Sequence, residues 1–136
     1  MQTFLPYPDF RKSVKCLDRQ RLGKQRVEAM QILKIVTGER TTGGWINHPA
    51  VLMWKGYPAA LRFYLKCCIE EWIFRGYNNT MEIPVIENEK DIKLPSWLGN
   101  ERFHASHRSN LLRKDPLYYG KFGWTENETL GYMWPV

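Results

Sequence analysis

The chain has 136 residues, 43% of them hydrophobic, which is typical of one globular domain with a single core. No apolar run approaches the roughly 20 residues that cross a bilayer, and the N-terminus lacks the basic-then-apolar pattern of a signal sequence. The three cysteines form neither a disulfide framework nor a C-x-x-C metal motif, so we expect a cytoplasmic protein without membrane contact.

Positive charge is concentrated in two blocks of the sequence. The net charge is +6; residues 1–30 hold seven Lys and Arg against three acids, and residues 101–121 hold five against two. Residues 76–100 are acidic by comparison. A local excess of positive charge indicates a polyanionic partner.

The first nine residues contain two prolines, which favour an extended lead-in over a helix. Such a segment allows the free amine of Met1 to reach another element of the fold.

Residues 13–37 have the period of a long helix. At about 100° per residue, most of their apolar side chains fall within one broad sector, which should face the core. That sector contains Val14, Leu17, Leu22, Ala29, Ile32, Leu33, Ile35 and Val36. Four polar side chains lie inside the same sector: Asp18, Arg21, Gln25 and Glu28.

Polar groups on a buried stripe need either partners or a cleft that water can enter. One interpretation is an internal network, in which Asp18 pairs with Arg21 and Gln25 pairs with Glu28. The other is an active site, with Glu28 as the catalytic carboxylate and Arg21 as its charge partner. The spacing alone leaves both interpretations open.

A basic stripe lies beside these polar side chains on the helical wheel. It consists of Lys15, Arg19 and Arg26, which fall within about 40° of one another. A stripe of this kind can follow a phosphate backbone.

Two further helices are predicted in the rest of the chain. Asn47-His48-Pro49 is a capping signal for a short helical segment that Pro58 interrupts. From Pro58, residues 58–75 have helical spacing and end at an Arg-Gly pair. Residues 77–96 have no sustained period and read as loop. A last helix spans residues 100–114, begins with a capping Asn and ends before a proline. We therefore predict a mainly α fold, a compact single domain (residues 1–136) of about three main helices with long loops.

The last helix carries the run HASHRSN. Its two histidines, His104 and His107, are three residues apart and could share an ion, but no third ligand is evident, so we expect no metal. Phosphate contact is the stronger expectation for the basic residues that follow, which are Arg108, Arg113, Lys114 and Lys121. No phosphate-binding Gly-rich loop, G-x-S-x-G or H-E-x-x-H motif occurs.

Three stretches, QRLGKQRVEAM, RFYLKCCIEEWIFRGYNNT and SHRSNLLRKDPLYYGK, together resemble the pyrimidine dimer DNA glycosylase family. The resemblance implies a helical domain that flips a nucleotide out of duplex DNA. It also implies cleavage of the glycosidic bond by an N-terminal amine and nicking of the abasic site by β-elimination, without a cofactor. The partner would be double-stranded DNA carrying a damaged or modified base, bound by a monomer.

The resemblance also assigns roles to residues. It places the essential carboxylate at Glu28, with Arg21 beside it. Together with the basic and helical positions above, the expected DNA contacts are Lys15, Arg19, Gln20, Gln25, Arg26, His107, Arg108, Arg113, Lys114, Tyr118, Tyr119 and Lys121.

The nucleophile departs from the family pattern. The family's phage member exposes its amine by removal of the initiator Met, whereas the bulky Gln2 should block that removal here. We therefore expect the amine of Met1 to attack the sugar, because an α-amine is partly unprotonated at neutral pH. Two alternatives stay open: a nucleic-acid-binding module without chemistry, and a glycosylase for a different modified pyrimidine.

Overall fold

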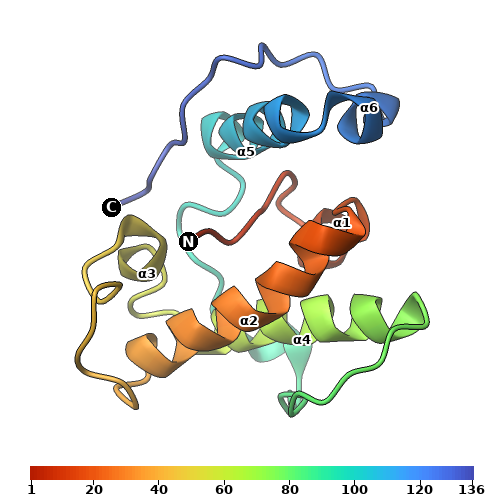
Figure 1. Ribbon diagram of the computed structural model, residues 1–136. Helices are drawn as coiled ribbons and strands as arrows, with labels where there is room; N and C mark the ends of the chain where they lie inside the picture. The colour runs from red at the N-terminus through yellow and green to blue at the C-terminus, as the bar shows by residue number, and fades with distance from the viewer.

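The computed structural model describes all 136 residues and contains six α-helices, two short 3-10 turns and no strand. The helices are α1 (Phe10–Lys15), α2 (Arg19–Val36), α3 (Pro49–Leu52), α4 (Pro58–Phe74), α5 (Glu101–Lys114) and α6 (Pro116–Tyr119), and the 3-10 turns are Glu89–Asp91 and Gly120–Phe122 (Figure 1). The prediction of a mainly α fold is confirmed, and α2, α4 and α5 are its three main helices.

Helices α2 and α4 pack against each other, and the N-terminal segment (residues 1–9) runs between this pair and α5 (Figure 1). Gly23 allows the two helices to approach closely, because a Cβ at this position would lie 3.2 Å from the ring of Trp72 on α4. One cluster of 25 buried hydrophobic residues forms the core. The cluster draws on the N-terminal segment as well as on the helices, so the start of the chain is part of the core.

Residues 13–37 do not form one helix, so that prediction was wrong. Helix α1 ends at Lys15, and Asp18 adopts an extended backbone as the N-cap of α2. Two distant side chains stabilise this break. The guanidinium of Arg75 donates to the carbonyl of Lys15 at 3.0 Å, and the backbone N–H of Asp18 donates to the hydroxyl of Tyr119 at 3.0 Å. These bonds replace the helical ones that a continuous helix would make.

The other two predicted helices are confirmed. Helix α4 has Pro58 in its first turn and is followed by Gly76, whose positive φ of 89° a glycine adopts without strain. The side chain of Asn100 caps α5 by accepting hydrogen bonds from the first N–H groups of the helix. Residues 77–96 are loop, as expected, apart from the 3-10 turn at Glu89–Asp91.

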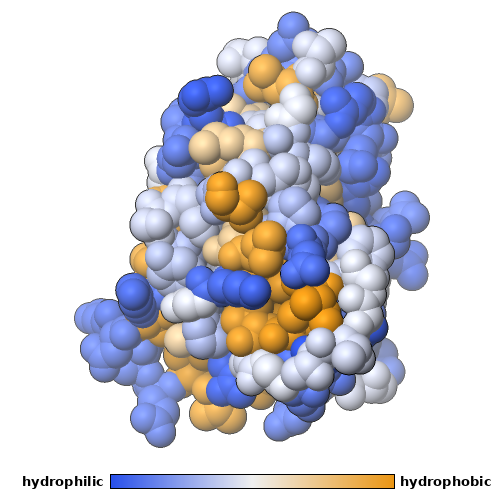
Figure 2. All heavy atoms as spheres, turned by 90° about the vertical axis from the view of Figure 1, so that its left-hand side faces the viewer, coloured by the Kyte–Doolittle hydropathy of each residue, from blue (hydrophilic) through white to orange (hydrophobic).

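Beyond α6, the C-terminal tail (residues 123–136) returns along α5 toward α3 and the N-terminus (Figure 1). The backbone N–H groups of Leu130 and Met133 donate to the hydroxyls of Ser109 and Ser106, at 3.2 and 3.1 Å, and so attach the tail to α5. Figure 2 looks onto the side that carries α3 and shows apolar side chains gathered in its lower half, with hydrophilic ones around them. No helix is both long enough and apolar enough to cross a membrane.

Candidate active site

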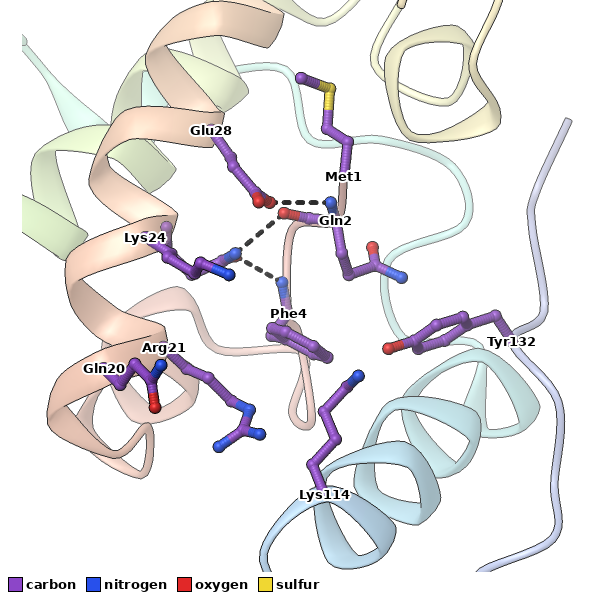
Figure 3. Close-up of a pocket in the computed structure, with 10 residues that line it drawn as sticks. Met1, Gln2, Phe4, Gln20, Arg21, Lys24, Glu28, Lys114 and Tyr132 are labelled. Carbon is purple, nitrogen blue, oxygen red and sulfur yellow. Dashed lines mark hydrogen bonds between the residues drawn. The ribbon is translucent and has the colours of Figure 1, made fainter.

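Two polar side chains from the apolar sector of α2, Gln25 and Glu28, attach the N-terminal segment to that helix (Figure 3). The backbone N–H of Gln2 donates to Glu28 Oε2 at 2.9 Å. Gln25 is almost fully buried; its amide nitrogen donates to the carbonyl of Gln2 at 2.9 Å, and its amide oxygen accepts from the N–H of Phe4 at 2.7 Å. An extended chain cannot satisfy its own backbone groups, and these two side chains take the place of a neighbouring strand.

Helix α4 and the segment after α3 hold the same stretch from a second side. The buried hydroxyl of Tyr64 lies 2.8 Å from both the carbonyl of Phe4 and the amide oxygen of Gln25. The indole N–H of Trp54 donates to the hydroxyl of Thr3 at 3.1 Å. Together with the bonds from α2, these contacts hold residues 2–4 in a fixed position next to Glu28.

Two histidines of α5 hold the segment from a third side. The N–H of Leu5 donates to His107 Nδ1 at 2.8 Å, and His104 Nδ1 donates to the carbonyl of Leu5 at 2.7 Å. The N–H of Gly99 donates to His104 Nε2 at 2.9 Å, which assigns the proton of His104 to Nδ1. Burial lowers the pKa of both histidines, and that of His107 falls to about 3, so both rings are neutral at pH 7.

Four residues expected to contact DNA are buried, so those expectations are corrected. His107 and Gln25 bind the N-terminal segment, and Tyr119 is fully buried against Asp18. Arg108 forms ion pairs with Glu101 and Glu126 and donates to the carbonyl of Pro6 at 2.7 Å. Polar residues at these positions satisfy buried backbone and carboxylate groups of the chain itself, a role that their sequence pattern does not distinguish from phosphate binding.

Asp18 and Arg21 form one half of the expected network. Their side chains are 3.1 Å apart, and the Tyr119 hydroxyl also donates to the Asp18 carboxylate. Burial raises the pKa of Asp18, but the hydrogen bonds from Tyr119 and Arg21 outweigh it and leave the pKa lowered. Gln25 and Glu28 do not pair with each other, and Arg21 is not the charge partner of Glu28.

A cleft of about 290 Å³ opens beside Glu28. It is lined by Met1, Gln2, Phe4, Gln20, Arg21, Lys24, Gln25, Glu28, Lys114 and Tyr132 (Figure 3). The cleft thus unites all three residues expected to be catalytic with two of the expected DNA contacts, Gln20 and Lys114, and the buried Gln25 forms part of its wall. Lys24, Gln2, Phe4 and Tyr132 were missed. Lys24 could have been found, because it lies one helical turn before Glu28, whereas nothing in the sequence places Tyr132 here.

The cleft is electropositive. Lys114 reaches into it from α5, and Arg21 and Lys24 enter from α2 (Figure 3). Burial, followed by the positive charges of Arg21, Arg113 and Lys24, lowers the pKa of Lys114. Cations held this close repel one another, and a phosphate between them would relieve the repulsion. The cleft is therefore a favourable place for a polyanion.

The other basic residues lie outside the cleft. Arg26 packs over the ring of Trp72, 4.0 Å from its centroid, and Arg19 lies 5.2 Å from that of Tyr77. Lys15 is exposed on α1 and does not continue the face of α2, because the helix breaks between them. The basic stripe expected on one helix therefore does not exist as such.

The basic residues near α6 are also engaged within the chain. Lys121 lies 3.9 Å from the ring centroid of Tyr118, and Arg113 donates to the side chain of Asn110 and, at 3.2 Å, to the carbonyl of Glu128. Arg113 and Lys121 remain exposed, so these contacts leave part of each cation accessible to solvent.

His48 is a further residue that the sequence did not assign to the site. Its Nδ1 accepts the N–H of Ala50 at 3.0 Å, which caps α3 and assigns the proton to Nε2. Burial and the N-terminal amine lower the pKa of His48, while the charge of Glu28 opposes them. This ring is therefore within electrostatic range of the amine and the carboxylate.

No curated protein and no solved structure matches the chain. A family model described as pyrimidine dimer DNA glycosylase matches residues 1–85, which is more than half of the chain. The matched residues include the N-terminal segment, Glu28 and all of α2 and α4. The chain therefore belongs to the pyrimidine dimer DNA glycosylase family.

Proposed function

We propose that the protein is a DNA glycosylase that excises a damaged or modified pyrimidine from duplex DNA, using its N-terminal amine as the nucleophile and nicking the abasic site afterwards. One observation carries the proposal. The start of the chain is held inside the fold, with the backbone nitrogen of residue 2 bonded at 2.9 Å to Glu28, at the edge of a basic cleft. Contacts from three helices hold residues 2–5 in place and so keep the start of the chain next to this carboxylate.

The chemistry requires an unprotonated amine and a nearby carboxylate. The amine nitrogen forms a bond to C1′ of the sugar as the bond between C1′ and the base breaks, and the base leaves with the electron pair. The positive charge that develops on the sugar is stabilised by the carboxylate of Glu28. A proton then passes from the nitrogen to O4′ as the C1′–O4′ bond breaks, and the opened sugar carries an iminium ion between the amine and C1′.

The same carboxylate is suited to the second step. Removal of the proton from C2′ of the iminium species expels the 3′ phosphate oxygen with the electrons of the C3′–O bond, which cuts the strand. Glu28 Oε2 is bonded to Gln2, whereas Oε1 accepts no hydrogen bond from the chain and is not buried. One oxygen thus positions the N-terminal segment and the other is available to move the proton.

Two forms of the chain would supply the amine. With Met1 retained, the nucleophile is the Met1 amine, because the nitrogen of Gln2 is then an amide; Met1 lines the cleft. Removal of Met1 would instead turn the nitrogen already bonded to Glu28 into the amine. The proposal keeps Met1 as the nucleophile, since the large side chain of Gln2 opposes removal.

Borohydride trapping tests the proposal. The protein is incubated with duplex DNA that contains either a pyrimidine dimer or an abasic site, and the reductant converts an iminium ion into a stable adduct. We expect an adduct, and the mass of its N-terminal peptide identifies Met1 or Gln2 as the attached residue. Salt-dependent DNA binding without any adduct would instead indicate a binding module.

The cleft contains two other amines, so the trapping experiment needs matched controls. Lys24 and Lys114 both line it. The variants Lys24→Arg and Lys114→Arg keep the positive charge and remove the primary amine. If the N-terminus is the nucleophile, both variants still form the adduct; loss of the adduct in either one would assign the reaction to that lysine.

A further inference from the structure

The six tryptophans fall into two groups according to their indole N–H. Four donate it within the chain: Trp54 to Thr3 at 3.1 Å, Trp72 to Asn78 at 2.8 Å, Trp97 to Met53 at 2.9 Å and Trp124 to Tyr7 at 2.7 Å. Trp45 and Trp134 make no such bond, and the indole nitrogen of Trp134 is not buried. Trp45 is 44% exposed. The indole N–H of neither residue is used within the chain, although the ring of Trp134 also packs against the hydrophobic core.

Both of these rings contact His48 edge to face. The ring centroids of Trp45 and His48 are 5.2 Å apart, and those of His48 and Trp134 are 5.6 Å apart. Trp134 in turn lies 5.5 Å from Tyr132, which lines the cleft. The four residues form an aromatic row (Tyr132, Trp134, His48 and Trp45) that leads from the cleft to the surface.

The row is assembled from segments far apart in the sequence. Tyr132 and Trp134 belong to the C-terminal tail, which ends beside α3 and the N-terminus (Figure 1). Trp45 and His48 belong to the loop before α3, where Gly43 has a positive φ of 128°. His48 is fixed by its bond to Ala50, so the middle of the row is held rigidly while its outer end sits on a glycine-rich loop.

The aromatic row meets the cleft at Tyr132, which enters from the tail beside Lys114, while Lys24 lies across the cleft on α2 (Figure 3). The cleft therefore offers an aromatic ring with cations around it. A nucleotide combines the matching groups, since its phosphate is anionic and its base is a flat ring. Bases turned out of a duplex lose their stacking neighbours, and aromatic side chains replace that stacking with little regard to base identity.

We propose that the aromatic row binds nucleobases that have left the DNA helix, by stacking them on Tyr132, Trp134 and Trp45 while the phosphates lie against Lys24 and Lys114. The inference rests on the proposed function, because a glycosylase must open the duplex at its target. It adds a binding site that extends beyond the reacting nucleotide, reached along the tail and the loop before α3.

Equilibrium binding tests the inference without relying on catalysis. Labelled duplexes that carry one unpaired nucleotide, in either strand, are compared with a fully paired duplex of the same length. We expect Trp45→Ala and Trp134→Ala each to weaken binding of a bulged duplex by about tenfold, within the range measured for loss of one base stack. Affinity for the paired duplex should change less than twofold. The strand whose bulge is affected identifies the base that stacks.

Three controls make the result specific. Trp45→Phe and Trp134→Phe keep an aromatic face and should restore most of the affinity. Phe74→Ala removes a ring that is 80% exposed at the end of α4 and lies outside the row, so it should leave binding unchanged. Melting temperatures identify any variant that has lost its fold, and quenching of tryptophan fluorescence by bulged DNA reports stacking in the unmodified protein as well.

The outcomes separate this inference from the proposed function. Equal losses on bulged and paired duplexes, or no loss on either, would overturn the aromatic row as a stacking site, even if excision is normal. Conversely, a selective loss on bulged DNA would support the row, even if borohydride trapping yields no adduct.

Discussion

Glu28 accepts the backbone N–H of Gln2 at 2.9 Å and forms no ion pair with Arg21, whose partner is Asp18. The carboxylate is therefore attached to the start of the chain rather than to the neighbouring cation on its own helix. This arrangement separates the two interpretations that the spacing of α2 left open. Asp18 and Arg21 pair with each other, as the network interpretation expected, whereas Glu28 pairs with neither of them and has one oxygen free beside the cleft.

Glu28→Gln should abolish most of the activity and leave the fold intact. The Gln amide oxygen can still accept the N–H of Gln2, and no cation loses its partner, so the melting temperature should change little. Base excision should fall by roughly 100-fold or more, the usual scale for loss of a positioned acid–base group. Oligonucleotide cleavage and thermal melting are measured on the same sample. A large fall in melting temperature with cleavage retained would contradict the catalytic role.

Gln25→Leu should have the opposite effect and destabilise the fold. The change removes the partners of the Phe4 N–H and the Gln2 carbonyl, which lie in a buried segment. Each unsatisfied buried group costs about 1–3 kcal/mol, so the free energy of unfolding should fall by roughly 3 kcal/mol. Urea unfolding measures it. Gln20→Leu is the matched control, because Gln20 is exposed on the same helix, and an equal loss there would refute the explanation.

The helices were predictable because their signals are local. The capping Asn100, the Pro58 start of α4 and the glycine that follows Arg75 all act within a few residues of the helix ends they define. The break before α2 was not predictable, because it depends on Arg75 and Tyr119, which bond to it from 60 and 101 residues away. Wheel positions that assume a continuous helix fail at such a break.

The site was partly predictable for a related reason. Polar side chains in an apolar sector identified Glu28 and Gln25 as residues that need partners, but the partners are backbone groups of the N-terminal segment, which have no side-chain signature. On α5 the sequence instead suggested DNA contacts that the fold does not allow, because polar residues there are buried. His107 and Arg108 have the composition of a phosphate-binding surface, and only burial separates them from Lys114, which lines the cleft.

Stability should fall as the pH drops below 6.5, because His107 must be neutral in the fold. Its pKa is lowered by burial from 6.5 to about 3. Between these values the unfolded chain binds a proton that the folded chain does not, so stability is full above pH 6.5 and is lost toward pH 3. His104, whose pKa is also lowered by burial, adds to the same trend. Melting temperatures between pH 7 and pH 4 measure the loss.

His107→Asn tests the origin of that pH dependence. The Asn oxygen can accept the Leu5 N–H in place of Nδ1 and does not titrate. The variant should be less stable than the unmodified protein at pH 7, because the ring leaves a cavity. The difference between the two should shrink at pH 4. Melting curves that fall in parallel would assign the acid sensitivity to other groups.

Lys114 and Arg108, six residues apart on α5, should respond differently to the loss of their charge. Lys114 reaches into the cleft, so Lys114→Gln should weaken binding to duplexes of any sequence about equally and reduce the slope of log affinity against log salt by about one.

Arg108 is 8% exposed and pairs with Glu126, so Arg108→Gln should instead lower the free energy of unfolding by about 3 kcal/mol. Its salt slope should stay unchanged at temperatures where the variant is folded. Salt titrations by fluorescence anisotropy and urea unfolding of both variants provide the measurements, and a reduced salt slope in Arg108→Gln would return that residue to the DNA interface.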